Sequence, residues 1–179
     1  MKQKLKLSNV YQLLSFGPVV LISTKYKDKA NIMPVAWLNP VDFDPPVIAL
    51  IIGDQSFTFD LVRKSKELVV NIPPASLVKK VVACGDCSGR KVDKFKKFNL
   101  TPVPSKKVKA PSIQECIASI ECRVVDQSMA KKYNIFIVKA VECQITKGSF
   151  DKYFKIKRFK PLLYLGKGYF TTASKVFKN

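Results

Sequence analysis

Two cysteines three residues apart are the first group in the sequence with the chemistry of a site. Cys84 and Cys87 form a C-x-x-C sequence, a spacing found in redox dithiols, and Arg90, Lys91 and the start of the next helix could stabilise a thiolate there. The pair could also be half of a metal site, but four-thiolate sites need a second close pair, which the chain lacks. The remaining interpretation is two ordinary free cysteines, because a thioredoxin-like motif follows a strand and this one follows a predicted helix.

A basic and aromatic segment, residues 147–160 (KGSFDKYFKIKRFK), is the second candidate. It holds six basic residues, one acid and four aromatics. Such aromatics can stack on bases while cations bind phosphates, which would make a nucleic-acid site. Alternatively, the aromatics pack and the lysines are solvated. The second interpretation is favoured, because the segment contains no known nucleic-acid motif.

The absence of histidine excludes several kinds of site. With no histidine in the chain, there is no Ser-His-Asp or Cys-His nucleophile system, no histidine zinc site and no histidine haem ligand. The 7 glycines form neither G-x-G-x-x-G nor a phosphate P-loop, so a dinucleotide fold and a nucleotide-hydrolysing site have no motif to support them.

The cysteines and the apolar stretches indicate in which cellular compartment the protein is expected. An odd number of cysteines without a secretory signal predicts reduced thiols and a cytoplasmic protein; they are Cys84, Cys87, Cys116, Cys122 and Cys143. The N-terminal apolar stretch is interrupted by polar residues, Gly17 and Pro18, and no cleavage site follows it. No apolar run approaches the ~18 residues of a membrane span.

The charge is large and uneven. The chain of 179 residues, 47% of them hydrophobic, predicts a single domain over 1–179. Its formal charge is +19, with +4 in residues 1–89 and +15 in residues 90–179. Such a field attracts nucleic acid, an anionic membrane or an acidic partner. Because the excess is mostly lysine, whereas base readout favours arginine, a solvated surface is the simpler interpretation.

The elements that must position any site are mainly strands. Apolar and β-branched runs predict strands at 18–24, 31–38, 47–52, 68–72, 115–125, 134–145 and 161–165, and short helices at 58–66, 77–83 and 92–98. Pro34 marks an edge or a bulge, and the prolines at 40, 45 and 46 are breakers. The short early gaps predict antiparallel pairing. We therefore expect a mainly β protein with short flanking α-helices, closed or nearly closed as a barrel.

Several stretches in order resemble one family. They are residues 31–41 (NIMPVAWLNPV) with 43–46 (FDPP), 53–58 (GDQSFT) with 67–73 (ELVVNIP), and 84–95 (CGDCSGRKVDKF), followed by 100–104, 121–126 and 161–166. Together they resemble the flavin reductase-like, FMN-binding split-barrel family, flavoredoxin type, from about residue 16 to 170. The resemblance implies a Greek-key antiparallel barrel and a homodimer, with FMN held noncovalently near the subunit interface.

The resemblance also implies a set of flavin contacts. They are Asn31, Met33, Pro34, Val35, Ala36, Trp37, Thr58, Ser88, Gly89, Lys94 and an aromatic near the ring at Tyr169 or Phe170. One position departs from the family pattern. Where the family commonly has a histidine before the long strand, this chain has Tyr133, so a phenol must take over that role or the role is lost.

These residue types suit FMN chemically. Hydroxyls of Thr58 and Ser88, backbone N–H groups at Ser88 and Gly89 and the Lys94 ammonium could bind the phosphate. Met33, Trp37 and Phe170 could wall the ring, and backbone groups at 34–36 could meet its pyrimidine edge. Taken singly, Met33 and Trp37 could instead be core, Thr58 a helix N-cap and Lys94 a solvated lysine.

The function implied is that of a flavoprotein oxidoreductase. It is either an NAD(P)H-dependent flavin reductase, with NADH or NADPH as a transient donor, or a flavoredoxin-type electron-transfer protein; no catalytic side chain is required. One alternative is an FMN electron carrier without its own NAD(P)H oxidase activity, which would dock an acidic redox protein on residues 90–179. Another is a nucleic-acid-binding barrel that uses residues 147–160 and is colourless.

Overall fold

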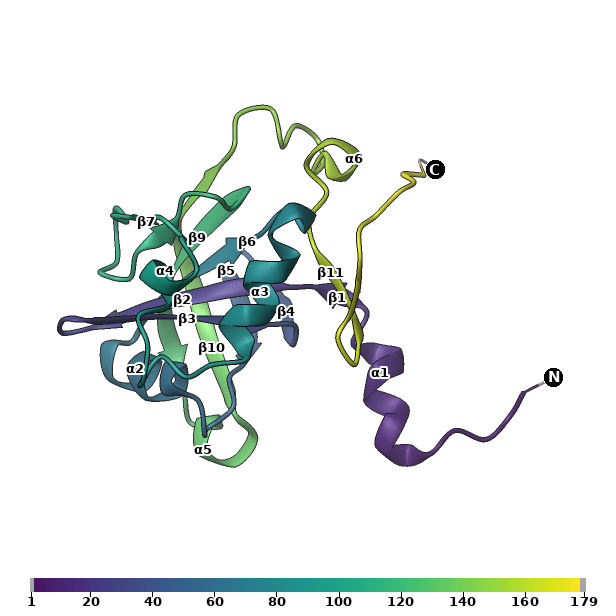
Figure 1. Cartoon of the computed structure of the whole chain (residues 1–179), viewed down its shortest axis with the longest axis horizontal. Coiled ribbons are helices and arrows are strands. Elements are labelled where there is room, and N and C mark those ends of the chain that lie inside the picture. The colour runs from purple at the N-terminus through teal and green to yellow at the C-terminus, as the bar shows by residue number, and fades with distance from the viewer. Residues whose placement is uncertain (1, 178–179) are drawn as a thin grey trace.

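A seven-stranded antiparallel sheet forms the body of the molecule in this computed structural model, which describes residues 2–177 (Figure 1). All its pairings are antiparallel. In spatial order the strands are β3 (Lys29–Val35), β2 (Val20–Tyr26), β6 (Glu67–Ile72), β9 (Ala118–Asp126), β10 (Ile135–Ile145), β5 (Pro46–Ile51) and β4 (Leu38–Phe43). Within residues 2–177, no ladder joins the two edge strands, β3 and β4.

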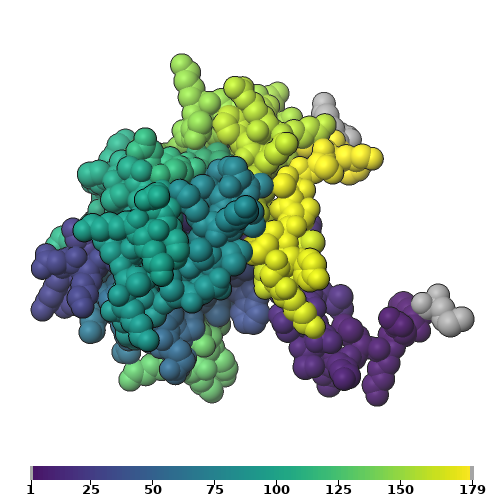
Figure 2. Space-filling view, viewed as in Figure 1, coloured from purple at the N-terminus to yellow at the C-terminus, as the bar shows by residue number. Residues whose placement is uncertain are grey.

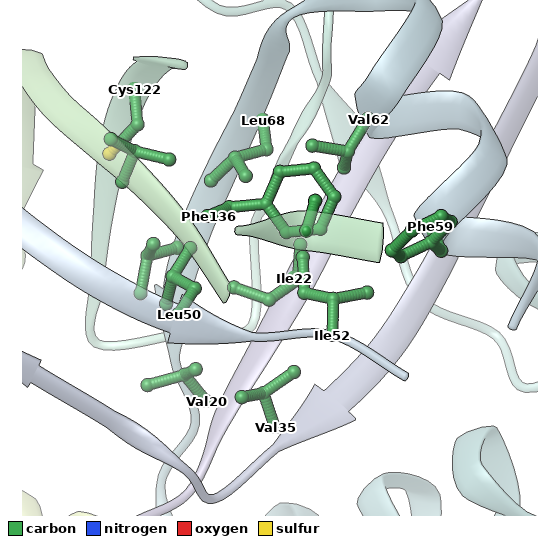
Figure 3. Packing of buried hydrophobic residues seen from close by; sticks show 13 residues of the cluster. Val20, Ile22, Val35, Leu50, Ile52, Phe59, Val62, Leu68, Cys122 and Phe136 are labelled. Atoms are coloured by element: carbon green, nitrogen blue, oxygen red, sulfur yellow. The ribbon is translucent and has the colours of Figure 1, made fainter. Parts of the chain in front are cut away.

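The concave side of the sheet encloses the main hydrophobic core. Phe136 of β10 is fully buried there, and its ring lies among Leu68, Val62 and Ile22 (Figure 3). Phe59 meets Phe136 edge-on, with ring centroids 5.3 Å apart. Because these side chains come from several strands and a helix, their burial is what curls the sheet into a barrel.

Helices cover the rest of the barrel. They are α2 (Phe57–Ser65), η2 (Ala75–Leu77), α3 (Val78–Gly85), α4 (Lys94–Lys97) and α5 (Ala130–Tyr133). α3 and α4 contribute Val81 and Phe95 to a second core cluster, which also holds Leu21 of β2. Since β2 is covered on both faces, it needs apolar residues at consecutive positions, which explains its continuous apolar sequence.

A smaller lobe stands beside the barrel. It contains η1 (Leu7–Asn9), α1 (Val10–Leu14), α6 (Ile156–Phe159) and a three-stranded sheet of β1 (Gly17–Pro18), β11 (Leu163–Gly166) and β12 (Tyr169–Thr171). Figure 2 shows the N-terminal segment in purple projecting from the main body, while the C-terminal segment in yellow lies against it. A short ribbon of β7 (Pro102–Val103) and β8 (Ser112–Ile113) packs near the central strands β6 and β9.

Asn71 connects several of these elements. Its side chain is fully buried in β6. Its Nδ2 donates to the Leu21 carbonyl and to Ser23 Oγ, both at 2.9 Å. Its Oδ1 accepts from Ile113 N–H at 3.0 Å and from Ser119 Oγ at 2.8 Å. One amide therefore ties β2, β8 and β9 to β6.

The mainly β fold with short helices is confirmed, while several element boundaries were wrong. The strand predicted at 31–38 divides into β3 and β4, with Trp37 between them. Pro40 does not break the chain, because β4 is an edge strand and an edge tolerates proline. Pro34 likewise lies in an edge strand, as predicted. The strand predicted at 115–125 starts only at Ala118, and the helix predicted at 92–98 shortens to α4. The elements α1, α5, α6, β7, β8 and β12 were not predicted from the sequence.

Buried thiols should make the fold sensitive to alkali. Burial raises the pKa of Cys84 from 9.0 to about 11, and those of Cys116 and Cys122 to about 12. The folded state keeps these protons to higher pH than the unfolded chain does. The stability that the protonated thiols provide is therefore complete below pH 9, falls above it, and is lost as pH rises through 11 to 12. We expect each thiol to lower the free energy of unfolding by about 1 kcal/mol at pH 10 relative to pH 7.5.

Urea unfolding at the two pH values, with reductant present, measures this loss. The Cys122→Ala variant should be less stable at both pH values, because it leaves a small cavity. Its stability should nevertheless fall less steeply with pH than that of the parent chain. Equal pH dependence in the two proteins would contradict the prediction.

Candidate functional site

A pocket of about 530 Å³ opens where β3, the start of α2 and the turn after α3 meet. The structure brings six of the predicted site residues together in its wall: Asn31, Met33, Thr58, Ser88, Gly89 and Lys94. They come from three separate stretches of the chain, so the fold creates this pocket by tertiary packing. The loop at 53–56 completes the wall.

Asn31 is the central polar group of the pocket. It is buried, and its Nδ2 donates to Thr58 Oγ1 at 2.8 Å. Its Oδ1 is buried and has no hydrogen-bond partner within residues 2–177. A buried amide oxygen without a donor is costly, so it indicates a polar ligand at this position.

Gly89 lies directly against Asn31. A Cβ built on Gly89 would stand 2.0 Å from Asn31 Oδ1, far inside van der Waals contact. Only glycine therefore fits between the turn and this amide. The backbone N–H groups of Ser88 and Gly89 donate no hydrogen bond among the described residues, which leaves two donors at the pocket wall.

Lys94 places a positive charge inside the pocket. Its side chain is only 4% exposed, and Nζ donates to the carbonyls of Ile32 at 2.9 Å and Cys84 at 2.6 Å. Burial lowers the pKa of Lys94. Within residues 2–177, no carboxylate lies within ion-pair distance of this ammonium. An anion in the pocket would therefore compensate a buried charge that the protein itself leaves unpaired.

The start of α2 forms another part of the wall. Ser56 is the N-cap, and its Oγ accepts from Phe59 N–H at 3.1 Å. Thr58 is the second residue of the helix and is not the cap, contrary to the alternative interpretation from sequence. The free N–H groups of a first turn attract negative charge. A serine just before an apolar run is the signal that identifies such a cap in a sequence.

Arg90 joins the two sides of the pocket mouth, a role that the sequence did not reveal. Its guanidinium pairs with Asp60 of α2, donates to the Gln55 carbonyl at 3.3 Å and lies over the Phe57 ring, 5.3 Å from its centroid. Because Arg90 is committed to these groups, the predicted stabilisation of a cysteine thiolate by Arg90 is not supported. Both Arg90 and Asp60 remain partly exposed.

The predicted residues of β3 beyond Met33 face other surroundings. Val35 is only 4% exposed and belongs to the barrel core, so its side chain cannot contact a ligand. Pro34 pairs regularly with Leu21 and packs on Gly85. Ala36 packs against the second core cluster. The backbone at 34–35, which was expected to meet the flavin, is thus regularly paired with β2, and Pro34 marks no bulge.

The predicted aromatic residues lie outside the wall of this pocket. Trp37 is 48% exposed and not core; its Nε1 donates to Ser15 Oγ at 3.3 Å, and its ring meets Tyr11 edge-on. Phe170 packs against Tyr164, with centroids 5.3 Å apart. Tyr169 is mostly exposed. These aromatics belong to the smaller lobe and its junction with the barrel.

Tyr133, the departure from the family pattern, ends α5 and is 54% exposed. The next residue, Asn134, accepts from Ile52 N–H through its backbone oxygen and from Asp54 N–H through Oδ1, at 2.9 and 3.1 Å. Asp54 lies in the pocket wall. Asn134 therefore ties the end of α5 to the loop that borders the pocket, whereas Tyr133 itself does not line the pocket.

The structure also shows where the C-x-x-C pair and the basic and aromatic segment at 147–160 lie. Cys84 and Cys87 line the same pocket as Lys94, and all five cysteines are free. In residues 147–160, Lys155 lies over the Tyr153 ring at 4.2 Å and pairs with Asp151. Within residues 2–177, no cluster of three or more metal-ligating side chains occurs, and no helix is long and apolar enough to cross a membrane.

Comparison with known proteins decides the family. The family model of the flavin reductase-like domain matches residues 15–173, which include every element of the barrel and the whole pocket. The chain belongs to the flavin reductase-like family. The family predicted from the sequence motifs is thus confirmed.

Relatives of the chain occur in archaea and bacteria. A protein of Archaeoglobus fulgidus with no assigned function is 40% identical over 110 residues, which cover 62% of each chain. YddH of Escherichia coli K12, also uncharacterised, is 29% identical over 178 residues, covering 96% of this chain and 94% of YddH. The match thus spans less than two thirds of the first relative and nearly all of the second.

Solved structures share the split-barrel fold. Flavoredoxin of Desulfovibrio vulgaris (Miyazaki F) superposes with a TM-score of 0.89 at 23% identity, covering 100% of this chain and 97% of that one. Flavoredoxin from Methanosarcina acetivorans superposes with a TM-score of 0.83 at 26% identity, covering 99% and 95%. The predicted split barrel is therefore confirmed for nearly the full length.

Proposed function

We propose that this chain binds FMN in the pocket around Lys94 and works as a flavin-dependent oxidoreductase. The observation that carries the proposal is a buried ammonium without a carboxylate, beside free backbone donors and an unsatisfied amide oxygen. An anionic ligand that also offers a hydrogen-bond donor satisfies all three. A flavin mononucleotide, with a dianionic phosphate, ribityl hydroxyls and a ring N–H, has this combination.

Each pocket residue has a role in that arrangement. Lys94, the Thr58 hydroxyl and the N–H groups of Ser88 and Gly89 would bind the phosphate. The unsatisfied Asn31 Oδ1 would accept from a flavin hydroxyl or N–H. Met33 offers an apolar wall from β3.

The redox chemistry belongs to the cofactor. Bound FMN would supply the hydride and electron transfer between NADH or NADPH and an acceptor. The chain holds the flavin by its phosphate, keeps a cation near it and packs apolar side chains around it. Tyr133, which precedes the Asn134 that bonds the pocket loop, is the residue we assign to the place of the missing histidine, with its phenol as a hydrogen-bond donor toward the flavin.

A second candidate is an electron carrier that receives electrons from a protein partner. The +15 charge of residues 90–179 favours an acidic redox protein as that partner. Anaerobic mixing with NADH and with NADPH separates the two candidates. Rapid bleaching of the flavin by either nucleotide supports the reductase, whereas no bleaching supports the carrier.

We further propose a cytoplasmic homodimer built from a single domain per chain. Support for the dimer comes from exposed apolar residues on α1 and β4, among them Leu14 at 82% and Phe43 at 91% exposure. Such a surface indicates an interface, and a second copy of the chain is the partner we propose. The free cysteines agree with a reducing compartment. Sedimentation of the purified chain measures the dimer.

The test of FMN binding compares two lysines of α4. Lys94→Met should weaken FMN binding about 10- to 100-fold, because it removes one charge-assisted hydrogen bond of about 1.5–3 kcal/mol. Lys96→Met is the matched control, since the Lys96 side chain is 88% exposed on the same helix. FMN titration followed by flavin fluorescence gives both affinities. Equal affinities in the two variants, or no FMN binding by the parent chain, would refute the proposed site.

A further inference from the structure

The C-x-x-C sequence lies in the wall of the proposed flavin pocket. Cys84 belongs to the last turn of α3 and is fully buried, while Cys87 follows the helix and is half-buried. Asp86 N–H donates to the Val82 carbonyl at 3.1 Å, and Cys87 Sγ donates to the Ala83 carbonyl at 3.6 Å. Asp86, the C-cap of α3, keeps right-handed helical backbone angles, so Cys87 lies about one turn beyond Cys84. Residues three apart on such a turn have Cβ atoms about 5–6 Å apart, so the two side chains are neighbours.

We propose that Cys84 and Cys87 form a reversible disulfide on reaction with hydrogen peroxide, and that this disulfide weakens flavin binding. The inference rests in part on the proposed function, because the second half concerns FMN. Hydrogen peroxide is the oxidant that reduced flavins generate with oxygen, so the oxidant would arise beside the thiols.

The reaction has two steps. Cys87, the thiol that solvent reaches, attacks one peroxide oxygen as its thiolate, and the O–O bond breaks to give a sulfenic acid and one water. Cys84 sulfur then attacks the Cys87 sulfur, forming the S–S bond and releasing the second water. Two thiols and one peroxide thus yield one disulfide and two waters. Burial raises the pKa of Cys84 to about 11, so Cys84 stays protonated at neutral pH and is not the thiol that attacks peroxide first. In the second step the Cys84 proton leaves with the hydroxyl of the Cys87 sulfenic acid as water.

Closing the disulfide must move the turn rather than the helix. A disulfide needs Cβ atoms about 3.5–4.5 Å apart, so the pair must approach by about 1–2 Å. Cys84 is fixed in the second core cluster with Val81 and Phe95. The displacement therefore falls on Cys87 and the residues that follow it.

The displaced turn carries the groups that would bind phosphate. Gly89 already lies so close to Asn31 that a Cβ would overlap its Oδ1, so the turn has no free space on that side. Moving Ser88 and Gly89 misplaces their N–H donors relative to Lys94. Lys94 itself hydrogen-bonds the Cys84 carbonyl and stays with the helix. Oxidation would thus separate two halves of one anion site.

The experiment measures thiols and flavin affinity on the same samples. Reduced, flavin-free protein is treated with one equivalent of hydrogen peroxide and quenched. We expect the titratable thiols under denaturing conditions to fall by two from five, an intact mass lower by two hydrogens, and a peptide that links Cys84 to Cys87. FMN affinity should fall at least tenfold, and dithiothreitol should restore it.

Two variants serve as comparisons. Cys87→Ser should form no disulfide, and peroxide should leave its FMN affinity unchanged. Cys143→Ser removes an exposed cysteine of β10 outside the pocket and should lose two thiols as the parent chain does. A disulfide mapped elsewhere, or unchanged FMN affinity in the fully oxidised protein, would overturn the proposal. Failure of the reduced protein to bind FMN overturns the proposed function, whereas the thiol count and peptide map decide the disulfide independently.

Discussion

Replacing Gly89 with alanine is expected to weaken FMN binding about 100-fold. The new methyl group would stand 2.0 Å from Asn31 Oδ1, so either Asn31 or the turn must move. Moving Asn31 breaks its 2.8 Å bond to Thr58, and moving the turn displaces the Ser88 and Gly89 donors. Loss of two polar contacts of about 1.5 kcal/mol each corresponds to roughly two powers of ten in affinity.

Gly53 supplies the matched control for this change. It lines the same pocket, yet a Cβ built there meets nothing within 4 Å. Gly53→Ala should therefore bind FMN within about threefold of the parent chain. Thermal unfolding of the apo proteins identifies any general loss of folding. If Gly89→Ala bound FMN as tightly as Gly53→Ala, the flavin would lie elsewhere on the molecule.

The largest loss of stability is expected for Asn71→Leu. Leucine has a similar shape but leaves the Ile113 N–H and the Ser119 hydroxyl without the acceptor that Asn71 Oδ1 provides. Each buried group left unpaired costs about 1–3 kcal/mol. Together with the lost Nδ2 bonds, we expect the free energy of unfolding to fall by about 3–5 kcal/mol, a large share of the about 5–15 kcal/mol typical of a domain.

Urea and thermal unfolding of the apo protein measure this effect. For a domain of this size, such a loss lowers Tm by about 10 °C. Asn39→Leu is the comparison, because Asn39 is exposed on the edge strand β4 and should change the free energy of unfolding by less than about 0.5 kcal/mol. A similar small effect at both positions would mean that water or neighbouring groups replace the Asn71 contacts.

The barrel strands were predictable because most of them are apolar and alternate or run continuously. The runs at 18–24, 47–52, 68–72 and 134–145 became β2, β5, β6 and β10. The strand boundaries near Pro40 were not predictable, because whether a proline breaks a strand depends on whether that strand lies at an edge of the sheet. The position of an edge is a tertiary property that the local sequence does not contain.

The motifs predicted which residues line the pocket, but not the contacts that hold those residues in place. Six predicted residues meet there, but the sequence could not show that Lys94 is anchored by the carbonyls of Ile32 and Cys84. Nor could it show that Val35 points into the core. Arg90 was misassigned because its partners, Asp60 and the Gln55 carbonyl, lie 30 and 35 residues away in the chain.

Arg90 also bears on how quickly a ligand leaves. Its exposed contacts with Asp60, Gln55 and Phe57 link α2 to the turn after α3 at the pocket mouth, and an exposed ion pair contributes only up to about 1 kcal/mol and is screened by salt. These contacts can therefore break without disturbing the buried Lys94 and Asn31. For a flavin held as proposed, residence time and affinity would depend on different residues. Salt would shorten the residence time through Arg90 more than it would weaken the buried contacts.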